Sequence, residues 1–182
     1  MASSVRLSLR AVSLPALDLC SPFIDVLGSA AFKPVKSDIQ GNVTKIRERQ
    51  QAAPAESTTL QTLVKTEIGG KQHKATEGLL WLVRGLDFTA QALRHNMDNE
   101  SKELSESFTS AYGNTLKPHH SFMVKPIFTL AMNATPYRKD FYAKLGPDEA
   151  RVKQELEVWL KALEDRLAIL KPFMASKDAQ WK

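Results

Sequence analysis

The sequence predicts an all-α protein, and two observations carry this prediction. Apolar residues recur every three or four positions in several long segments, which is the period of a helix with one buried face. Strand signals are poor, because β-branched runs are short and no Asn-Gly or Asp-Gly turn separates alternating segments. A chain of 182 residues is long enough for one domain with one substantial core.

Prolines and glycines divide the first half of the chain into four expected helices. Pro22 follows a capping-type serine and is typical of a helix start, and Pro34 ends this first apolar segment. Pro54 separates the second helix from the third, which the pair Gly69-Gly70 closes. The fourth has nearly continuous apolar positions, so we expect it at the centre of the fold. The expected spans are 23–31, 35–51, 58–67 and 76–97.

Proline also marks the helix boundaries in the second half. Pro118 precedes the sixth helix, Pro136 starts the seventh and Pro172 ends the eighth. The sixth is apolar almost all round, so we expect it to face the core on one side and a ligand cavity or a membrane on the other. These helices bring the expected total to about eight, and they span 102–116, 119–133, 137–145 and 149–170.

The balance of charged residues excludes few classes of binding partner. Lys and Arg number 25 and Asp and Glu number 20, a net charge of +5 that is spread along the chain. This excess favours anionic membrane surfaces, although a merely basic protein has the same balance. No zinc-finger spacing, RNP signature or dense basic helix is present, so nucleic acid is not an expected partner. Cys20 is the only cysteine, which rules out an intrachain disulfide and fits a small buried hydrophobe.

Residues 1–17 differ in composition from the rest. They carry Arg6, Arg10 and several serines, with no acid before Asp18, and no apolar run here or elsewhere reaches the length of a membrane span. A flexible leader and a mitochondrial transit peptide share this composition. We expect a leader over 1–17, a single domain over 18–182 and a cytoplasmic protein, with organelle import as the alternative.

Catalytic motifs are absent. The chain has no GxSxG, HExxH, CxxC, GxGxxG or Walker-type glycine loop. His119 and His120 are adjacent, so two imidazoles on one helix cannot face the same metal ion. The sequence therefore predicts no enzyme, no metal and no cofactor.

The second expected helix has a polar stripe beside an apolar one. Asp38, Asn42 and Lys45 lie at i, i+4 and i+7, which places an acid, an amide and an amine on one face. Such a face offers hydrogen-bond acceptors and donors together, as a binding surface for a polar group requires. The neighbouring stripe consists of Ile39, Val43 and Ile46.

Trp81 lies in the segment LLWLVRGL of the fourth helix, with Glu77 one turn before it and Arg84 one turn after it. Two interpretations fit this pattern. A core tryptophan would use the indole for packing, whereas an exposed indole flanked by polar groups would make a platform for a sugar ring. Periodicity alone leaves both open.

Four stretches in this order resemble the glycolipid transfer protein family: SDIQGNVTKI (37–46), LLWLVRGLDF (79–88), HHSFMVKPIF (119–128) and ATPYRKDF (134–141). The resemblance extends over about 22–182 and is strongest to the fungal heterokaryon-incompatibility members. It implies that 18–182 form a glycolipid transfer domain, a two-layer helical sandwich that binds one glycosphingolipid without catalysis.

The resemblance also implies roles for individual residues. Asp38 resembles the acid that accepts from the ceramide amide and a sugar hydroxyl, and His120 resembles the histidine that donates to the ceramide carbonyl. Trp81 resembles the sugar platform, which favours a sugar headgroup over the alternative of a ceramide-1-phosphate. The other expected glycolipid-binding residues are Asn42, Lys45, Glu77 and Trp181.

Membrane contact is expected from Phe122, Tyr112 and Lys125. Phe122 stands where animal members have a tryptophan, so the interfacial anchor lacks a polar handle. The expected partners are a glucosyl-, galactosyl- or lactosylceramide and a reversibly contacted membrane, with the protein a monomer. The alternative role is a glycosphingolipid sensor or signalling protein in heterokaryon incompatibility rather than a bulk transporter.

Overall fold

The structure, a computed structural model, describes residues 33–181. Over these residues it contains seven α-helices, short 3-10 turns and no strand, so the all-α prediction is confirmed there. The expected leader, Cys20 and the expected helix 23–31 lie outside the described residues. The helices are α2 (Lys33–Ala52), α3 (Leu60–Ile68), α4 (Lys74–Asp98), α5 (Leu104–Asn114), α6 (Val124–Asn133), α7 (Arg138–Leu145) and α8 (Glu149–Ala175).

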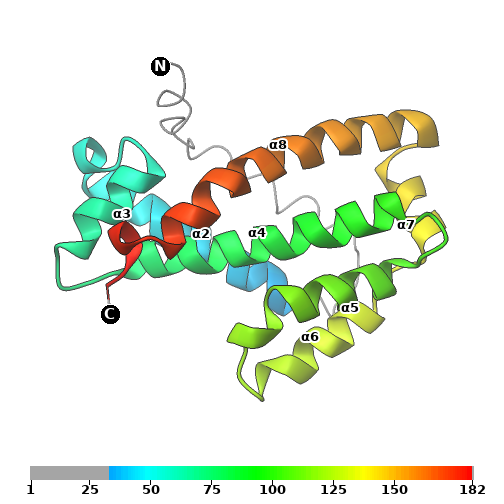
Figure 1. Cartoon of the computed structure of the whole chain (residues 1–182), viewed down its shortest axis with the longest axis horizontal. Coiled ribbons are helices and arrows are strands. Elements are labelled where there is room, and N and C mark those ends of the chain that lie inside the picture. The colour runs from blue at the N-terminus through cyan, green and yellow to red at the C-terminus, as the bar shows by residue number, and fades with distance from the viewer. Residues whose placement is uncertain (1–32, 182) are drawn as a thin grey trace, which may run out of the picture.

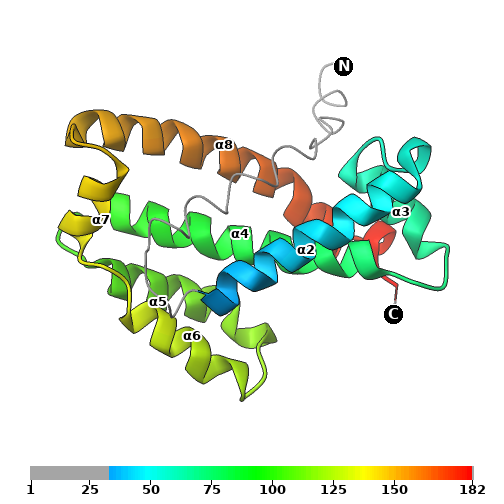
Figure 2. The same ribbon diagram turned by 180° about the vertical axis from the view of Figure 1, so that it is seen from behind.

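Helix α4 is the centre of the fold, as its nearly continuous apolar sequence predicts. It packs against α2, α3, α5 and α8. Figure 1 shows α8, α4 and α5 side by side in one layer, and Figure 2 shows α2 and α6 on the other side of that layer. The core lies between the layers, and its most buried side chains include Ile46, Leu63, Leu79, Leu82, Leu93, Phe108 and Leu160.

The start of α4 is capped by a residue from another helix. The buried Glu67 side chain of α3 accepts hydrogen bonds from the backbone nitrogens of Ala75 and Thr76, at 3.0 and 2.6 Å, and from the Thr76 hydroxyl at 2.6 Å. A carboxylate at this end satisfies free backbone N–H groups and complements the helix dipole. Glu67 thus fixes the beginning of the helix that carries Glu77 and Trp81.

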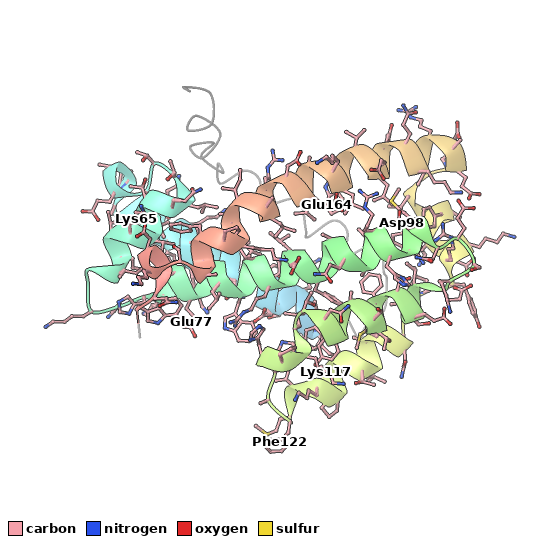
Figure 3. All side chains as sticks on the ribbon, viewed as in Figure 1. Lys65, Glu77, Asp98, Lys117, Phe122 and Glu164 are labelled. Carbon is pink, nitrogen blue, oxygen red and sulfur yellow. The ribbon has the colours of Figure 1, made fainter. Side chains whose placement is uncertain are left out.

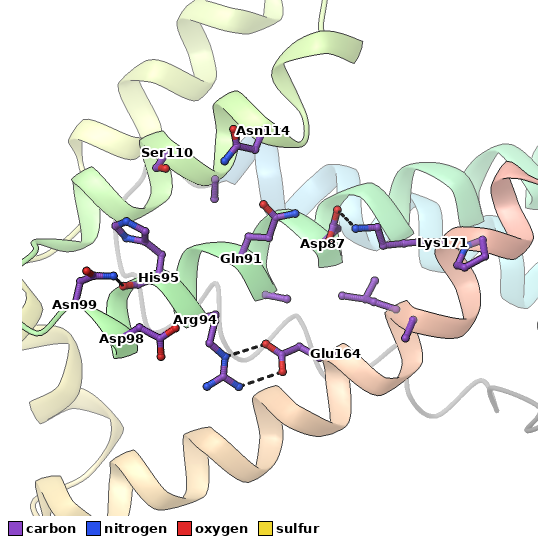
Figure 4. Close-up of a pocket in the computed structure, with 15 residues that line it drawn as sticks. Asp87, Gln91, Arg94, His95, Asp98, Asn99, Ser110, Asn114, Glu164 and Lys171 are labelled. Carbon is purple, nitrogen blue, oxygen red and sulfur yellow. Dashed lines mark hydrogen bonds and ion pairs between the residues drawn. The ribbon is translucent and has the colours of Figure 1, made fainter. Parts of the chain in front are cut away.

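Ion pairs join α4 to α8 on the outer face of their layer. Arg94 donates from Nε to Glu164 at 2.9 Å and from Nη1 to Glu157 at 2.6 Å, while Lys171 pairs with Asp87 at 2.7 Å. The Arg94–Glu164 and Lys171–Asp87 pairs line a cavity of about 590 Å³ between α4, α5 and α8, shown in Figure 4.

Two expected helix boundaries are wrong. The helix expected over 119–133 begins only at Val124, since Lys117–His119 form a 3-10 turn and His120 is extended. The helix that Pro172 was expected to end continues to Ala175. Proline removes one backbone donor, and within a turn of a helix end this loss is small because little helix follows it.

The sixth helix faces the core with one side only, as its position at the edge of the fold requires. Only Ala131 and Met132 of α6 are buried, while Ile127 and Leu130 are exposed. α6 packs mainly against α5 at the edge of the molecule. Its apolar face is therefore available for contact with something other than the described core. No described helix is both long enough and apolar enough to cross a bilayer.

Candidate functional site

The polar stripe of α2 forms a connected chain of side chains. Asn42 donates from Nδ2 to the Asp38 carboxylate at 3.1 Å, and Lys45 donates from Nζ to Asn42 Oδ1 at 3.2 Å. Asn42 is only 3% exposed and is flanked by the exposed Asp38 and the half-buried Lys45. The predicted grouping on one face is therefore present, with the central amide held by both neighbours.

Partial removal from water raises the pKa of the Asp38 carboxyl above its usual range. The nearby Lys45 ammonium and the hydrogen bond from Asn42 act in the opposite direction but do not cancel this effect. A charged acceptor kept partly from water binds a donor more strongly than a fully hydrated one.

Helix α4 meets this stripe at Gly78. A Cβ atom at this glycine would lie 3.1 Å from the backbone oxygen of Asn42 and 3.3 Å from Lys45 Cβ. Gly78 follows Glu77 and precedes Trp81 by three residues, so the helix crossing brings the segment of α4 that carries Glu77 and Trp81 against Asn42 and Lys45 of α2. Nothing in the spacing of α2 or α4 alone reveals this contact, and sequence reasoning missed Gly78.

Trp81 lies at the surface of α4 and is half-buried rather than part of the core. Its ring stacks on the imidazole of His120, with centroids 5.7 Å apart and planes inclined by 25°. The Arg84 guanidinium lies over the indole at 4.9 Å from the centroid. Trp81 is therefore not part of the core cluster, and its ring faces His120 and Arg84, so its use as a sugar platform stays a prediction.

His120 is the histidine that reaches Trp81. Its Nδ1 lies 3.2 Å from the Tyr112 hydroxyl, and its ring is 4.4 Å from that of Phe128. Burial lowers the pKa of the His120 imidazole, and the neighbouring His119, Lys125 and Arg84 side chains lower it further, which favours the neutral ring. Burial raises the pKa of the Tyr112 phenol, which therefore keeps its proton.

An aromatic cluster lies directly behind His120. Tyr112 stacks on Phe128 with centroids 5.3 Å apart, and Phe88 packs edge-on against Phe108, Tyr112 and Phe128. The cluster joins α4, α5 and α6, so an apolar interior begins where the polar site ends.

Trp181 and Glu77 lie at the beginning of α4. Trp181 stacks on His73 at 6.1 Å, and His73 is one turn before the exposed Glu77. The expected binding residues thus come from four regions of the chain: α2, α4, the loop before α6 and, for Trp181, the C-terminal segment. The described residues contain no group of three or more metal-ligating side chains.

The expected membrane contacts divide into two kinds. Phe122 is 81% exposed and lies at the tip of the loop before α6, on the same side of the molecule as Glu77 in Figure 3. Lys125 is half-buried. Tyr112 is 4% exposed, so it cannot itself touch a membrane in this structure, and the expectation fails because the ring is used to hold His120.

Comparison with known proteins identifies the family. The profile of the family described as "Glycolipid transfer protein (GLTP)" matches residues 14–147. The chain belongs to the glycolipid transfer protein family. The resemblance inferred from four short stretches is thereby confirmed, and the matched region includes the α2 stripe, Gly78, Trp81 and His120.

Relatives in the glycolipid transfer protein family support this assignment. A glycolipid transfer protein of Aureobasidium melanogenum is 64% identical over 168 residues, which cover 92% of this chain and 84% of that protein. The crystal structure of HET-C2, a fungal glycolipid transfer protein, aligns with a TM-score of 0.89 and 56% identity over 92% of this chain and 86% of its own.

A structure of FAPP2, described as selecting simple glycosphingolipids using the GLTP-fold, is similar at 35% identity. It aligns with a TM-score of 0.79 over 89% of this chain and 82% of its own. The two-layer helical fold expected from the sequence is thus the fold of the family.

Proposed function

We propose that this protein binds one glycosphingolipid and transfers it between membranes without altering it covalently. The observation that carries the proposal is the meeting of three chemistries at one place. Asp38, Asn42 and Lys45 supply hydrogen bonds, Trp81 supplies a flat apolar face, and His120 stands between this face and the aromatic cluster. A sugar needs hydrogen-bonding groups and a flat apolar face, an amide linkage needs a donor and an acceptor, and hydrocarbon chains need an apolar interior.

The amide of ceramide offers one donor and one acceptor. Asp38 accepts from the amide N–H and from a sugar hydroxyl, and Asn42 and Lys45 bind further hydroxyls. His120 donates to the acyl carbonyl. The hexose lies on Trp81, with Glu77 and Trp181 near its outer edge. The hydrocarbon chains pass His120 towards the aromatic cluster and the apolar faces of α4 and α6.

A comparison of the energy of burying the chains with the energy of the headgroup hydrogen bonds indicates that the headgroup decides which lipid is bound. Burying one CH₂ away from water is worth about 0.8 kcal/mol, but a lipid already buries its chains in the bilayer. Moving the chains into the protein is therefore nearly neutral and discriminates poorly. Each charge-assisted hydrogen bond to the headgroup is worth about 1.5–3 kcal/mol, so a few such bonds decide which lipid is bound. The protein then works as a cytoplasmic monomer without a cofactor.

Native mass spectrometry of the purified protein tests the proposal. We expect a co-purified or added glycosylceramide to bind with a stoichiometry of one and to be recovered with unchanged mass after transfer between vesicles. Glycosylceramides, ceramide-1-phosphates and glycerolipids are scored together. A preference for ceramide-1-phosphate, or a chemically changed lipid, would contradict the proposal.

Tyr112 is expected to prepare His120 for lipid binding. The Tyr112 hydroxyl and His120 Nδ1 are 3.2 Å apart. We infer that the phenol donates to Nδ1, which places the imidazole proton on Nε2, where it can donate to the acyl carbonyl. Tyr112→Phe removes this bond but keeps the ring packing. We expect a roughly fivefold weaker affinity for glucosylceramide, the effect of one ordinary hydrogen bond, measured by vesicle titration. An unchanged affinity, with an unchanged melting temperature, would remove Tyr112 from the site.

Phe122 is expected to contact the membrane. Together with Met123, Ile127 and Leu130 it forms an exposed apolar surface beside α6. Phe122→Trp adds an N–H group that favours the interfacial region of a bilayer, so partitioning onto phosphatidylcholine vesicles should increase several-fold. The matched control is Val158→Trp, because Val158 is exposed on α8. Equal partitioning of the two variants would place the membrane contact elsewhere.

A further inference from the structure

Gly78 is the position at which α4 lies against the backbone of α2 at the candidate site. Glycine has no side-chain carbon. A Cβ atom added at Gly78 would lie 3.1 Å from Asn42 O, 3.3 Å from Lys45 Cβ and 3.4 Å from Lys45 Cδ. Ordinary carbon contacts are about 3.5–4.0 Å. The Asn42 oxygen belongs to the backbone of a helix, so it cannot move aside without moving α2.

The other glycines of these two helices show that this contact is specific. Gly85 on α4 and Gly41 on α2 have nothing within 4 Å of an added Cβ. A glycine inside a helix is destabilising relative to alanine, so these positions would tolerate or gain from the substitution. Only at Gly78 does the neighbouring helix occupy the space of the side chain, among the glycines of α2 and α4 that the structure describes.

The Gly78 contact involves Asn42 and Lys45, which belong to the proposed headgroup site. Asn42 and Lys45 are consecutive members of the hydrogen-bonded chain that includes Asp38, and Gly78 lies between Glu77 and Trp81 on α4. A change in the separation of α2 and α4 at this point would therefore also change the separation of the α2 hydrogen-bonding groups from the α4 helix that carries the indole.

We propose that Gly78 is a positioning residue that sets the width of the headgroup site. This inference rests on the proposed function. A hexose must touch the indole with its face and the α2 side chains with its hydroxyls at the same time, and hydrogen bonds weaken steeply when geometry is lost. A methyl group at Gly78 moves α2 and the Lys45 stem outward by a few tenths of an ångström and loosens one of the two contacts.

The predicted effect is on the sugar and not on the lipid as a whole. Ceramide without a sugar does not need Trp81, Asn42 or Lys45. Its amide linkage uses His120, which is not on α2, and Asp38, which lies one turn away from the Gly78 contact at Asn42 and Lys45. Gly78→Ala should therefore lower the ratio of glucosylceramide affinity to ceramide affinity roughly fivefold, the effect of one ordinary hydrogen bond. A residue with a merely structural role would lower both affinities together.

The experiment uses the full chain and phosphatidylcholine vesicles that contain either glucosylceramide or ceramide with the same acyl chain. Wild-type protein, Gly78→Ala and Gly85→Ala are compared by titration and by thermal melting. We expect Gly85→Ala to keep the wild-type ratio and Gly78→Ala to lose it while remaining folded. If the wild-type protein does not bind glucosylceramide in these vesicles, the proposed function itself is refuted.

Two outcomes would overturn the assignment of Gly78 alone. In the first, wild-type protein prefers glucosylceramide and Gly78→Ala keeps that ratio within twofold. In the second, Gly78→Ala is unfolded at 25 °C while Gly85→Ala is folded. The contact would then be needed for packing and would not act on the sugar site.

Discussion

Asp38→Val is expected to abolish glycosylceramide transfer while the protein stays folded. In the proposed complex Asp38 accepts from both the ceramide amide and a sugar hydroxyl, and valine offers neither bond. Losing two charge-assisted hydrogen bonds at about 1.5–3 kcal/mol each corresponds to at least a roughly 100-fold weaker affinity. The fold should survive because Asp38 is exposed and Asn42 keeps its bond to Lys45.

The measurement for Asp38→Val is the transfer of a fluorescent glucosylceramide between phosphatidylcholine vesicles. Glu48→Val is the matched control, because Glu48 is an exposed acid on the same helix and receives the same β-branched residue. Glutamate is a better helix former than aspartate, so the control carries the larger cost in helix propensity. We expect wild-type transfer from Glu48→Val and none from Asp38→Val. Comparable transfer by the two variants would remove Asp38 from the site.

The parts of the fold that depend on local sequence were predictable. Helical periodicity located all seven described α-helices, and the spacing of Asp38, Asn42 and Lys45 placed them on one face, because both follow from the turn of a single helix. The start of α6 was missed because the apolar pattern continues back through 119–123, where a 3-10 turn and an extended residue interrupt the helix.

The parts of the site that depend on contacts between helices were not predictable from spacing. Trp81 and His120 are far apart in sequence, and only the family resemblance paired them before the structure showed them stacked. No role was predicted for Gly78 from the sequence, because the atoms that leave no room for a side chain there belong to α2. Tyr112 resembled a surface aromatic, yet its position on the inner face of α5 buries it beneath His120.

These tertiary contacts also explain why the site has a defined shape. Glu67 fixes the beginning of α4, and the Gly78 contact fixes how closely α2 approaches that helix. His120, from the loop before α6, stacks on Trp81. Each contact constrains a different element, so the acceptors, the indole and the imidazole are placed before a ligand arrives. Such preorganisation reduces the ordering cost of binding and makes affinity sensitive to small displacements.

Trp81→Ala is expected to remove the preference for a sugar headgroup without unfolding the protein. A hexose that covers about 80 Å² of the indole at about 25 cal/mol per Å² gains about 2 kcal/mol, a roughly 30-fold effect on affinity. Trp81 is half-buried and lies outside the core, so its loss should cost little stability. Trp81→Phe keeps a smaller flat face and should retain part of the preference.

Trp159→Ala is the control for Trp81→Ala, because it removes a tryptophan that is not part of the proposed sugar site. Trp159 is half-buried on α8, where it packs against the core. We expect Trp159→Ala to melt at a lower temperature than Trp81→Ala but to keep the wild-type ratio of glucosylceramide to ceramide affinity. Trp81→Ala should show the reverse pattern, because its indole contacts Arg84 and His120 and not the core. If Trp81→Ala still preferred glucosylceramide as strongly as the wild type, the sugar would have to be read by the α2 side chains alone.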